Sequence, residues 1–86
     1  MRLDSLPFGQ SAVVVSVEDR PQVGSTDVIA RRLRELGFVP GEPVRLAAWG
    51  PIGADPLLIQ IGFTRFALRR SEAARVVVSP QAGSAA

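Results

Sequence analysis

The chain has 86 residues, the length of a single domain, and its eight acidic and ten basic residues leave a net charge of +2. All ten basic residues are arginines, and histidine and cysteine are missing, which excludes disulfides, imidazole or thiolate metal sites and histidine-based catalysis. No apolar run approaches the roughly 20 residues of a membrane-spanning helix, and the opening residues do not resemble a secretory signal. We therefore expect a cytoplasmic domain over residues 1–79 and a flexible tail over residues 80–86.

The first part of the chain predicts a strand, a loop and the start of a helix. Residues 12–17 are apolar and mostly β-branched, which favours a strand. Residues 18–24 contain the proline and glycine of a connecting loop. Ser25 or Thr26 is then expected to cap the helix with its hydroxyl group.

The spacing of residues in this helix predicts one buried face and one charged face. The expected buried stripe follows the helical period and consists of Ile29, Leu33 and Leu36. The expected solvent face carries charges four residues apart, which would pair with one another in water: Asp27, Arg31 and Glu35.

The end of the helix is the most informative stretch of the sequence. Gly37 stands where a left-handed residue ends a helix, so Phe38 should contact Leu33, as in a Schellman ending. Pro40 prevents the helix from continuing, and Pro40 and Gly41 suit the central positions of a type II turn.

From residue 44 onward the apolar period changes from 3.6 to 2, which predicts strands. The expected strands cover residues 44–49, 57–62, 66–68 and 76–78. A loop over residues 50–56 separates the first two strands, and a tight turn near Phe63 and Thr64 precedes the third. Ser71 is expected to cap a single helical turn before the last strand.

Five short strands and one helix predict a mainly β fold, a small barrel with the helix at one end. Closing the strands into a barrel removes exposed strand edges and gives the alternating apolar residues one common interior. The expected core residues are Leu33, Val44, Leu46, Ile59, Ile61, Phe66 and Leu68.

The side chains offer little for catalysis. Serines and threonines are present, but no histidine, lysine or cysteine could activate them as nucleophiles. The carboxylates are scattered and show no clustered ligand set, which leaves a metal site undefined. We therefore expect no enzyme activity and no cofactor, and a net charge so close to zero gives little support for a nucleic-acid partner.

A binding surface is the remaining functional expectation. The candidate partner-binding residues combine the end of the expected strand over residues 44–49 and the loop after it with the arginines that follow the expected strand over residues 66–68: Trp49, Ile52, Asp55, Arg69 and Arg70. Trp49 lies out of phase with the apolar alternation, so it belongs either to a second layer of the core or to an exposed interface anchor. The arginines of the helix are expected to pair with neighbouring acids and to stay in solvent.

Three stretches together resemble the ferrous iron transport protein A (FeoA) family. LRELGFVPGEPVRL at residues 33–46 is similar to the helix-to-strand signature of that family. DPLLIQI at residues 55–61 resembles its central strand, and FALRRSEAARVVV at residues 66–78 resembles its closing segment. The residues that match the signature, which we interpret as structural, are Leu33, Leu36, Gly37, Phe38, Pro40 and Gly41.

The resemblance implies an SH3-like β-barrel that acts as a cytoplasmic accessory protein of bacterial ferrous iron uptake. Its implied partner is the GTPase region of the membrane protein FeoB, so its place of action is the inner face of the membrane. The alternative is a metal- or ligand-sensing module, because the fold also resembles the C-terminal domain of iron-dependent repressors. Pairing of an uncovered barrel edge with a second copy remains open.

Overall fold

The computed structural model describes residues 1–20, 27–52 and 55–81, with only the backbone described for Trp49, Pro51 and Ile52. Among these residues, no helix is long and apolar enough to cross a membrane. The described part contains a short 3-10 turn, η1, and two α-helices, α1 and α2. Their bounds are Leu3–Ser5 for η1, Val28–Glu35 for α1 and Arg70–Ala73 for α2.

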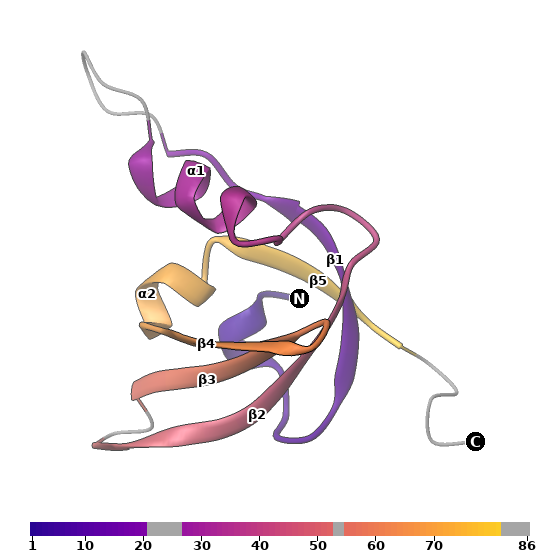
Figure 1. Cartoon of the computed structure of the whole chain (residues 1–86), viewed down its shortest axis with the longest axis vertical. Coiled ribbons are helices and arrows are strands. Elements are labelled where there is room, and N and C mark those ends of the chain that lie inside the picture. Colours follow the sequence, from indigo (N-terminus) through magenta and orange to yellow (C-terminus); the bar gives the residue numbers. More distant parts are fainter. Residues whose placement is uncertain (21–26, 53–54, 82–86) are drawn as a thin grey trace.

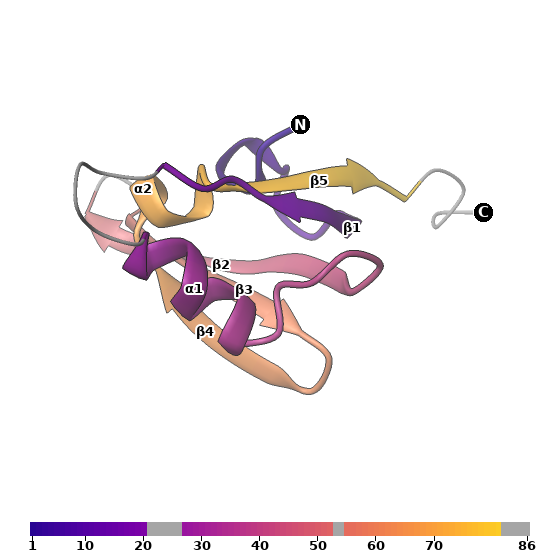
Figure 2. The same ribbon diagram turned by 90° about the horizontal axis from the view of Figure 1, so that it is seen from above.

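Five antiparallel strands form one curled sheet in the order β4-β3-β2-β1-β5. Their bounds are Ser11–Val17 (β1), Pro43–Ile52 (β2), Asp55–Ile61 (β3), Thr64–Leu68 (β4) and Val76–Pro80 (β5). The sheet bends so that β1 and β5 lie on one side of the core and β3 and β4 on the other (Figures 1 and 2). The predicted mainly β fold with one substantial helix is confirmed.

The core contains the residues that the alternation predicted. Six of the seven expected core residues are buried, and Phe66 is partly buried against the same cluster, with its ring centroid 6.4 Å from that of Phe38. Leu3 and Leu6 of the N-terminal segment are also buried, and η1 packs beside β5 and α2. Side chains from every strand therefore share one interior.

The end of α1 has the predicted geometry. The amide of Phe38 donates to Leu33 O at 3.1 Å and that of Gly37 to Arg34 O at 3.0 Å, the two bonds of a Schellman ending. Gly37 has a φ of 112°, and Leu33 and Phe38 are both buried. Leu33, Gly37 and Phe38 thus form the end of α1 that the sequence predicted.

The turn that follows is also as predicted. The amide of Glu42 donates to Val39 O at 3.1 Å, and Gly41 has a φ of 92°, as the third residue of a type II turn requires. Gly41 also donates to Val14 O at 2.8 Å, so the turn is attached to β1.

The predicted faces of α1 are wrong in two respects. Ile29 is 39% exposed, and Ala30 takes its place beside Leu33 in the core. Asp27, expected in solvent, is only 8% exposed and is the N-cap residue, because its carboxylate binds the amide of Ala30 and the guanidinium of Arg75. Ala30 lies three residues before Leu33 and therefore shares its inward face, while Ile29 lies at the edge of that face. Ser25 and Thr26, the predicted caps, lie outside the described residues.

The strand boundaries differ from the prediction around β2 and β3. β2 extends to Ile52 and pairs there with Asp55, so most of the predicted loop over residues 50–56 belongs to a hairpin. A register shift between Leu46 and Ala48 interrupts the strict alternation that the sequence suggested. Leu46, Ala47 and Ala48 are all apolar and fit either register, which is why the pattern did not indicate the bulge.

Two smaller predictions also need correction. The tight turn between β3 and β4 is formed by Gly62 and Phe63, and Thr64 is already in β4. Arg69, not Ser71, is the N-cap residue of α2. The reason is that the carboxylate of Glu72 accepts the amide of Arg69, and this contact needs no side-chain hydroxyl.

Candidate partner-binding groove

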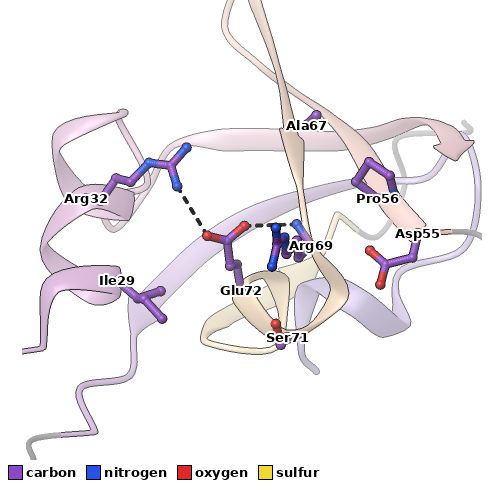
Figure 3. A pocket seen from close by; sticks show the side chains of 8 residues that line it. All are labelled: Ile29, Arg32, Asp55, Pro56, Ala67, Arg69, Ser71 and Glu72. Carbon is purple, nitrogen blue, oxygen red and sulfur yellow. Dashed lines mark hydrogen bonds and ion pairs between the residues drawn. The ribbon is translucent and has the colours of Figure 1, made fainter.

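A groove of about 900 Å³ opens where α1, α2, the start of β3 and the end of β4 meet (Figure 3). Its lining combines apolar, cationic and acidic side chains: Ile29, Arg32, Asp55, Pro56, Ala67, Arg69, Ser71 and Glu72. Figure 3 shows α1 on one side of this groove, with Arg69 and Glu72 between α1 and the start of β3.

The wall formed by α1 is anchored by a buried ion pair behind it. Asp27 accepts the amide of Arg20 at 2.6 Å and that of Ala30 at 3.1 Å, and it also binds the Arg75 guanidinium. The amide of Arg20 contributes most to lowering the pKa of Asp27, with further contributions from Ala30 and Arg75. The carboxylate therefore stays ionised, and α1 begins at a fixed point of the fold.

Glu72 joins the two sides of the groove. Its Oε1 atom accepts the amide of Arg69 at 3.0 Å, and its Oε2 atom accepts Nη1 of Arg32 at 3.2 Å (Figure 3). The carboxylate of Glu72 thus connects Arg69, the residue directly after β4, to Arg32 on α1. The signal for this in the sequence is the spacing of a capping box, with an acid three residues after the N-cap position.

The start of β3 is positioned by a close backbone approach. A Cβ atom at Gly50 would lie 2.6 Å from the carbonyl carbon and oxygen of Asp55, so only glycine fits there. Oδ1 of Asp55 in turn accepts the amide of Arg70 at 3.1 Å. Asp55 therefore supports the start of α2 and lines the groove as well.

The predicted site residues divide into three groups in the structure. Asp55 and Arg69 line the groove. The side chain of Arg70 instead extends toward the N-terminal segment, where its Nη1 atom donates to Asp4 O at 3.3 Å. The backbones of Trp49 and Ile52 pair with Leu57 and Asp55, and the side chains of both lie outside what the structure describes.

Sequence reasoning missed the contributions of both helices to the groove. Ile29 had been assigned to the core, and Arg32 to a solvent-exposed face. The contact of Arg32 with Glu72 spans 40 positions of the sequence, so no local spacing could reveal it.

The exposed face of β4 is cationic. Arg65, Ala67 and Arg69 are exposed and alternate with inward-facing Phe66 and Leu68. Within the described residues, no carboxylate forms an ion pair with Arg65 or Arg69, whereas Arg32 pairs with Glu72. The groove therefore offers the positive charge of Arg69 to an acidic partner.

The described residues include no group of three or more carboxylates that could hold a metal ion. The model of the FeoA domain matches residues 1–80. The chain belongs to the FeoA family.

Two relatives illustrate this membership. A crystal structure of FeoA from Stenotrophomonas maltophilia in complex with zinc is 63% identical, covers 92% of this chain and 89% of its own, and superposes with a TM-score of 0.80. That protein is described as a prokaryotic SH3-domain protein and as a candidate activating factor of bacterial ferrous iron transport. The barrel described above is accordingly an SH3-like FeoA fold.

The second relative is an Fe(2+) transport protein A/Fe(2+) transporter FeoB fusion protein from Porphyromonas gingivalis. It is 36% identical over 78 residues, which make up 91% of this chain and 8% of the fusion protein. This FeoA-family chain thus corresponds to a small part of that transporter. A manganese-dependent transcriptional repressor, 15% identical with a TM-score of 0.74 over 94% of this chain and 41% of its own, shares the fold alone.

Proposed function

We propose that this FeoA-family chain is a non-catalytic, cytoplasmic accessory module of ferrous iron uptake that binds the GTPase region of FeoB. The observation that carries the proposal is the fusion in the Porphyromonas gingivalis relative, where an FeoA segment and FeoB belong to one polypeptide. A member of this family that is not covalently joined to FeoB would need a binding surface in place of that link. Binding at the GTPase region would let the module regulate transport without chemistry of its own.

The groove is the surface that best suits this role. It carries apolar contacts at Ile29 and Pro56 beside the guanidinium of Arg69, which forms no ion pair with any residue that the structure describes, a combination common at interfaces. A chain without histidine, lysine or cysteine contributes shape and fixed charge rather than a nucleophile. Of the residues predicted from the sequence, Asp55 and Arg69 belong to this proposed surface.

Binding of the purified chain to the cytoplasmic region of FeoB from the same organism tests the proposal. Arg69→Glu should weaken binding about tenfold, because it replaces an exposed groove cation with an acid. Arg45→Glu is the matched control: Arg45 is also exposed and donates to Gln60 at 3.0 Å, but it lies on β2, away from the groove. Equal binding by the unmodified chain and Arg69→Glu would remove the groove from the proposal, and no binding by the unmodified chain would remove the function.

Metal sensing is a second candidate function, favoured by the zinc complex of the Stenotrophomonas maltophilia relative. In that case zinc or ferrous iron should bind the isolated chain and change its affinity for the FeoB region. Calorimetric titration with each ion, followed by the binding assay with and without the ion, separates sensing from simple docking. An affinity for FeoB that does not change with either ion would exclude sensing.

A further inference from the structure

One edge of the sheet is open toward the groove. β4 is the last strand of the sheet and pairs with β3 alone among the described segments. Ile61 and Thr64 flank the two-residue turn between these strands, so they form a hydrogen-bonded pair. From Thr64 onward, the backbone N–H and C=O groups of every second residue of β4 therefore point toward β3. The backbone groups of Arg65 and Ala67 consequently point away from the sheet.

Arg69 shows which way this edge faces. It lies two residues after Ala67, so its backbone amide points in the same direction as those of Arg65 and Ala67. Its amide donates to Glu72 at 3.0 Å, and Glu72 contacts Arg32 on α1 at 3.2 Å. The unpaired edge of β4 therefore faces α1, across the groove that Ala67 and Arg69 line (Figure 3). A helix beside an open strand edge is the arrangement into which an extended peptide can add as a further strand.

We infer that the groove binds an extended segment that adds to β4 as a sixth strand and in which acidic and apolar residues alternate. This inference rests on the proposed function, because it specifies how the partner segment would bind. Successive side chains of an added strand point to opposite faces of the sheet. Those on the outer face would lie beside Arg65 and Arg69, which favours carboxylates, and those on the inner face would lie beside Phe66 and Ile29, which favours apolar groups.

The charge of β4 argues against a second copy of this chain as the occupant. An antiparallel pair of β4 strands centred on Ala67 places Arg65 of one copy opposite Arg69 of the other, and like charges in that position are destabilising. A pair centred on Phe66 places arginines of the two copies diagonally across from each other, which is also unfavourable. An acidic strand removes this repulsion and supplies the counter-charges.

The probe for this inference is a short, end-capped peptide in which valine and glutamate alternate, compared with the same peptide carrying lysine in place of glutamate. Amide hydrogen exchange of the protein is followed by NMR with each peptide. The glutamate peptide should slow exchange at Arg65 and Ala67 by about tenfold or more, because their amides become strand hydrogen bonds. The lysine peptide should leave both rates unchanged.

Two kinds of variant separate the backbone contribution from the charge contribution. Ala67→Pro removes an edge donor at a position where an edge strand tolerates proline, and it should abolish the protection. Arg69→Glu should weaken binding of the glutamate peptide about tenfold, whereas Arg45→Glu should keep it within about twofold. If Ala67→Pro does not fold, Arg69→Glu still decides the charge prediction and the exchange rates of the unmodified protein decide the strand prediction.

Each remaining outcome contradicts the inference. Peptide binding without slower exchange at Arg65 and Ala67 would exclude strand addition. Equal binding of both peptides would exclude charge recognition. No binding of either peptide would exclude the groove as a peptide site. The outcomes with FeoB are distinguishable from these. If Ala67→Pro binds the FeoB region as well as the unmodified chain does, strand addition is wrong while the proposed function stands.

Discussion

The two walls of the groove use charged residues in opposite ways. Behind α1, Asp27 and Arg75 are nearly buried and bound to each other, and the same carboxylate also holds two backbone amides. Arg65 on β4 and Arg69 directly after it are exposed and form no ion pair within the described residues. A buried charge left without its partner is strongly destabilising, so the first pair has a structural role. An exposed cation beside an open strand edge costs little in the free protein and is available to a partner.

The largest expected effect is a loss of stability, and it distinguishes the buried face of α1 from the face that lines the groove. Leu33→Ala should lower the free energy of unfolding by about 2–5 kcal/mol, because Leu33 is 2% exposed and contacts Phe38 in the core. Ile29→Ala, on the groove face, should change it by about 0.5 kcal/mol or less. Urea denaturation of both variants measures the difference.

The binding assay should order these two variants the other way. Ile29→Ala should weaken binding to the FeoB region, because it removes an apolar group that lines the groove. Leu33→Ala should bind normally at temperatures where it remains folded. Equal losses of stability in the two variants would contradict the assignment of the two faces.

The fold could be read from the sequence to a large extent because its signals are local. The Schellman ending at Gly37 and the turn at Pro40 and Gly41 depend on neighbouring residues alone, and the alternation in β3 depends on the strand itself. Asp27 shows the limit of such reasoning. A charged residue at helical spacing is normally assigned to solvent, but Asp27 is held inside by two backbone amides and by the guanidinium of Arg75, 48 positions away.

The groove was less accessible to prediction than the fold. Asp55 and Arg69 were proposed because they adjoin a loop and the end of a strand, and both line it. Arg70, the neighbour of Arg69, could not be told apart from it by type, yet its side chain contacts Asp4 on the N-terminal segment. A surface assembled from four elements depends on tertiary contacts that composition and periodicity do not encode.

The second-largest expected effect is a dependence of folding stability on pH, and it tests the structural role of the pair formed by Asp27 and Arg75. The pKa of Asp27 is lowered in the folded state, so the unfolded chain binds a proton more readily than the folded chain does. The contribution of Asp27 to stability is therefore complete above the ordinary aspartate pKa of about 4 and is lost as the pH falls through the lower folded value. Asp27→Asn should destabilise the protein at neutral pH, and its deficit should shrink below about pH 4.

Thermal unfolding of Asp27→Asn and Arg75→Gln at several pH values checks this prediction. Arg75→Gln removes the same ion pair from its other side, so the double variant should be less destabilised than the two single variants added together. Additive effects of the two substitutions would show that Asp27 and Arg75 do not act as a pair in solution.

The smallest expected effect comes from an exposed pair on α1 that contacts neither the core nor the groove. Nε of Arg31 donates to Glu35 at 3.0 Å, with both side chains more than half exposed. Glu35→Ala should change the free energy of unfolding by about 0.5 kcal/mol or less, and added salt should reduce the difference further, because solvent screens a pair of this kind. A larger effect that persists in high salt would mean that an exposed charge pair helps to hold α1 in place. The contrast between a buried structural pair and exposed charges free to bind a partner would then no longer hold for this helix.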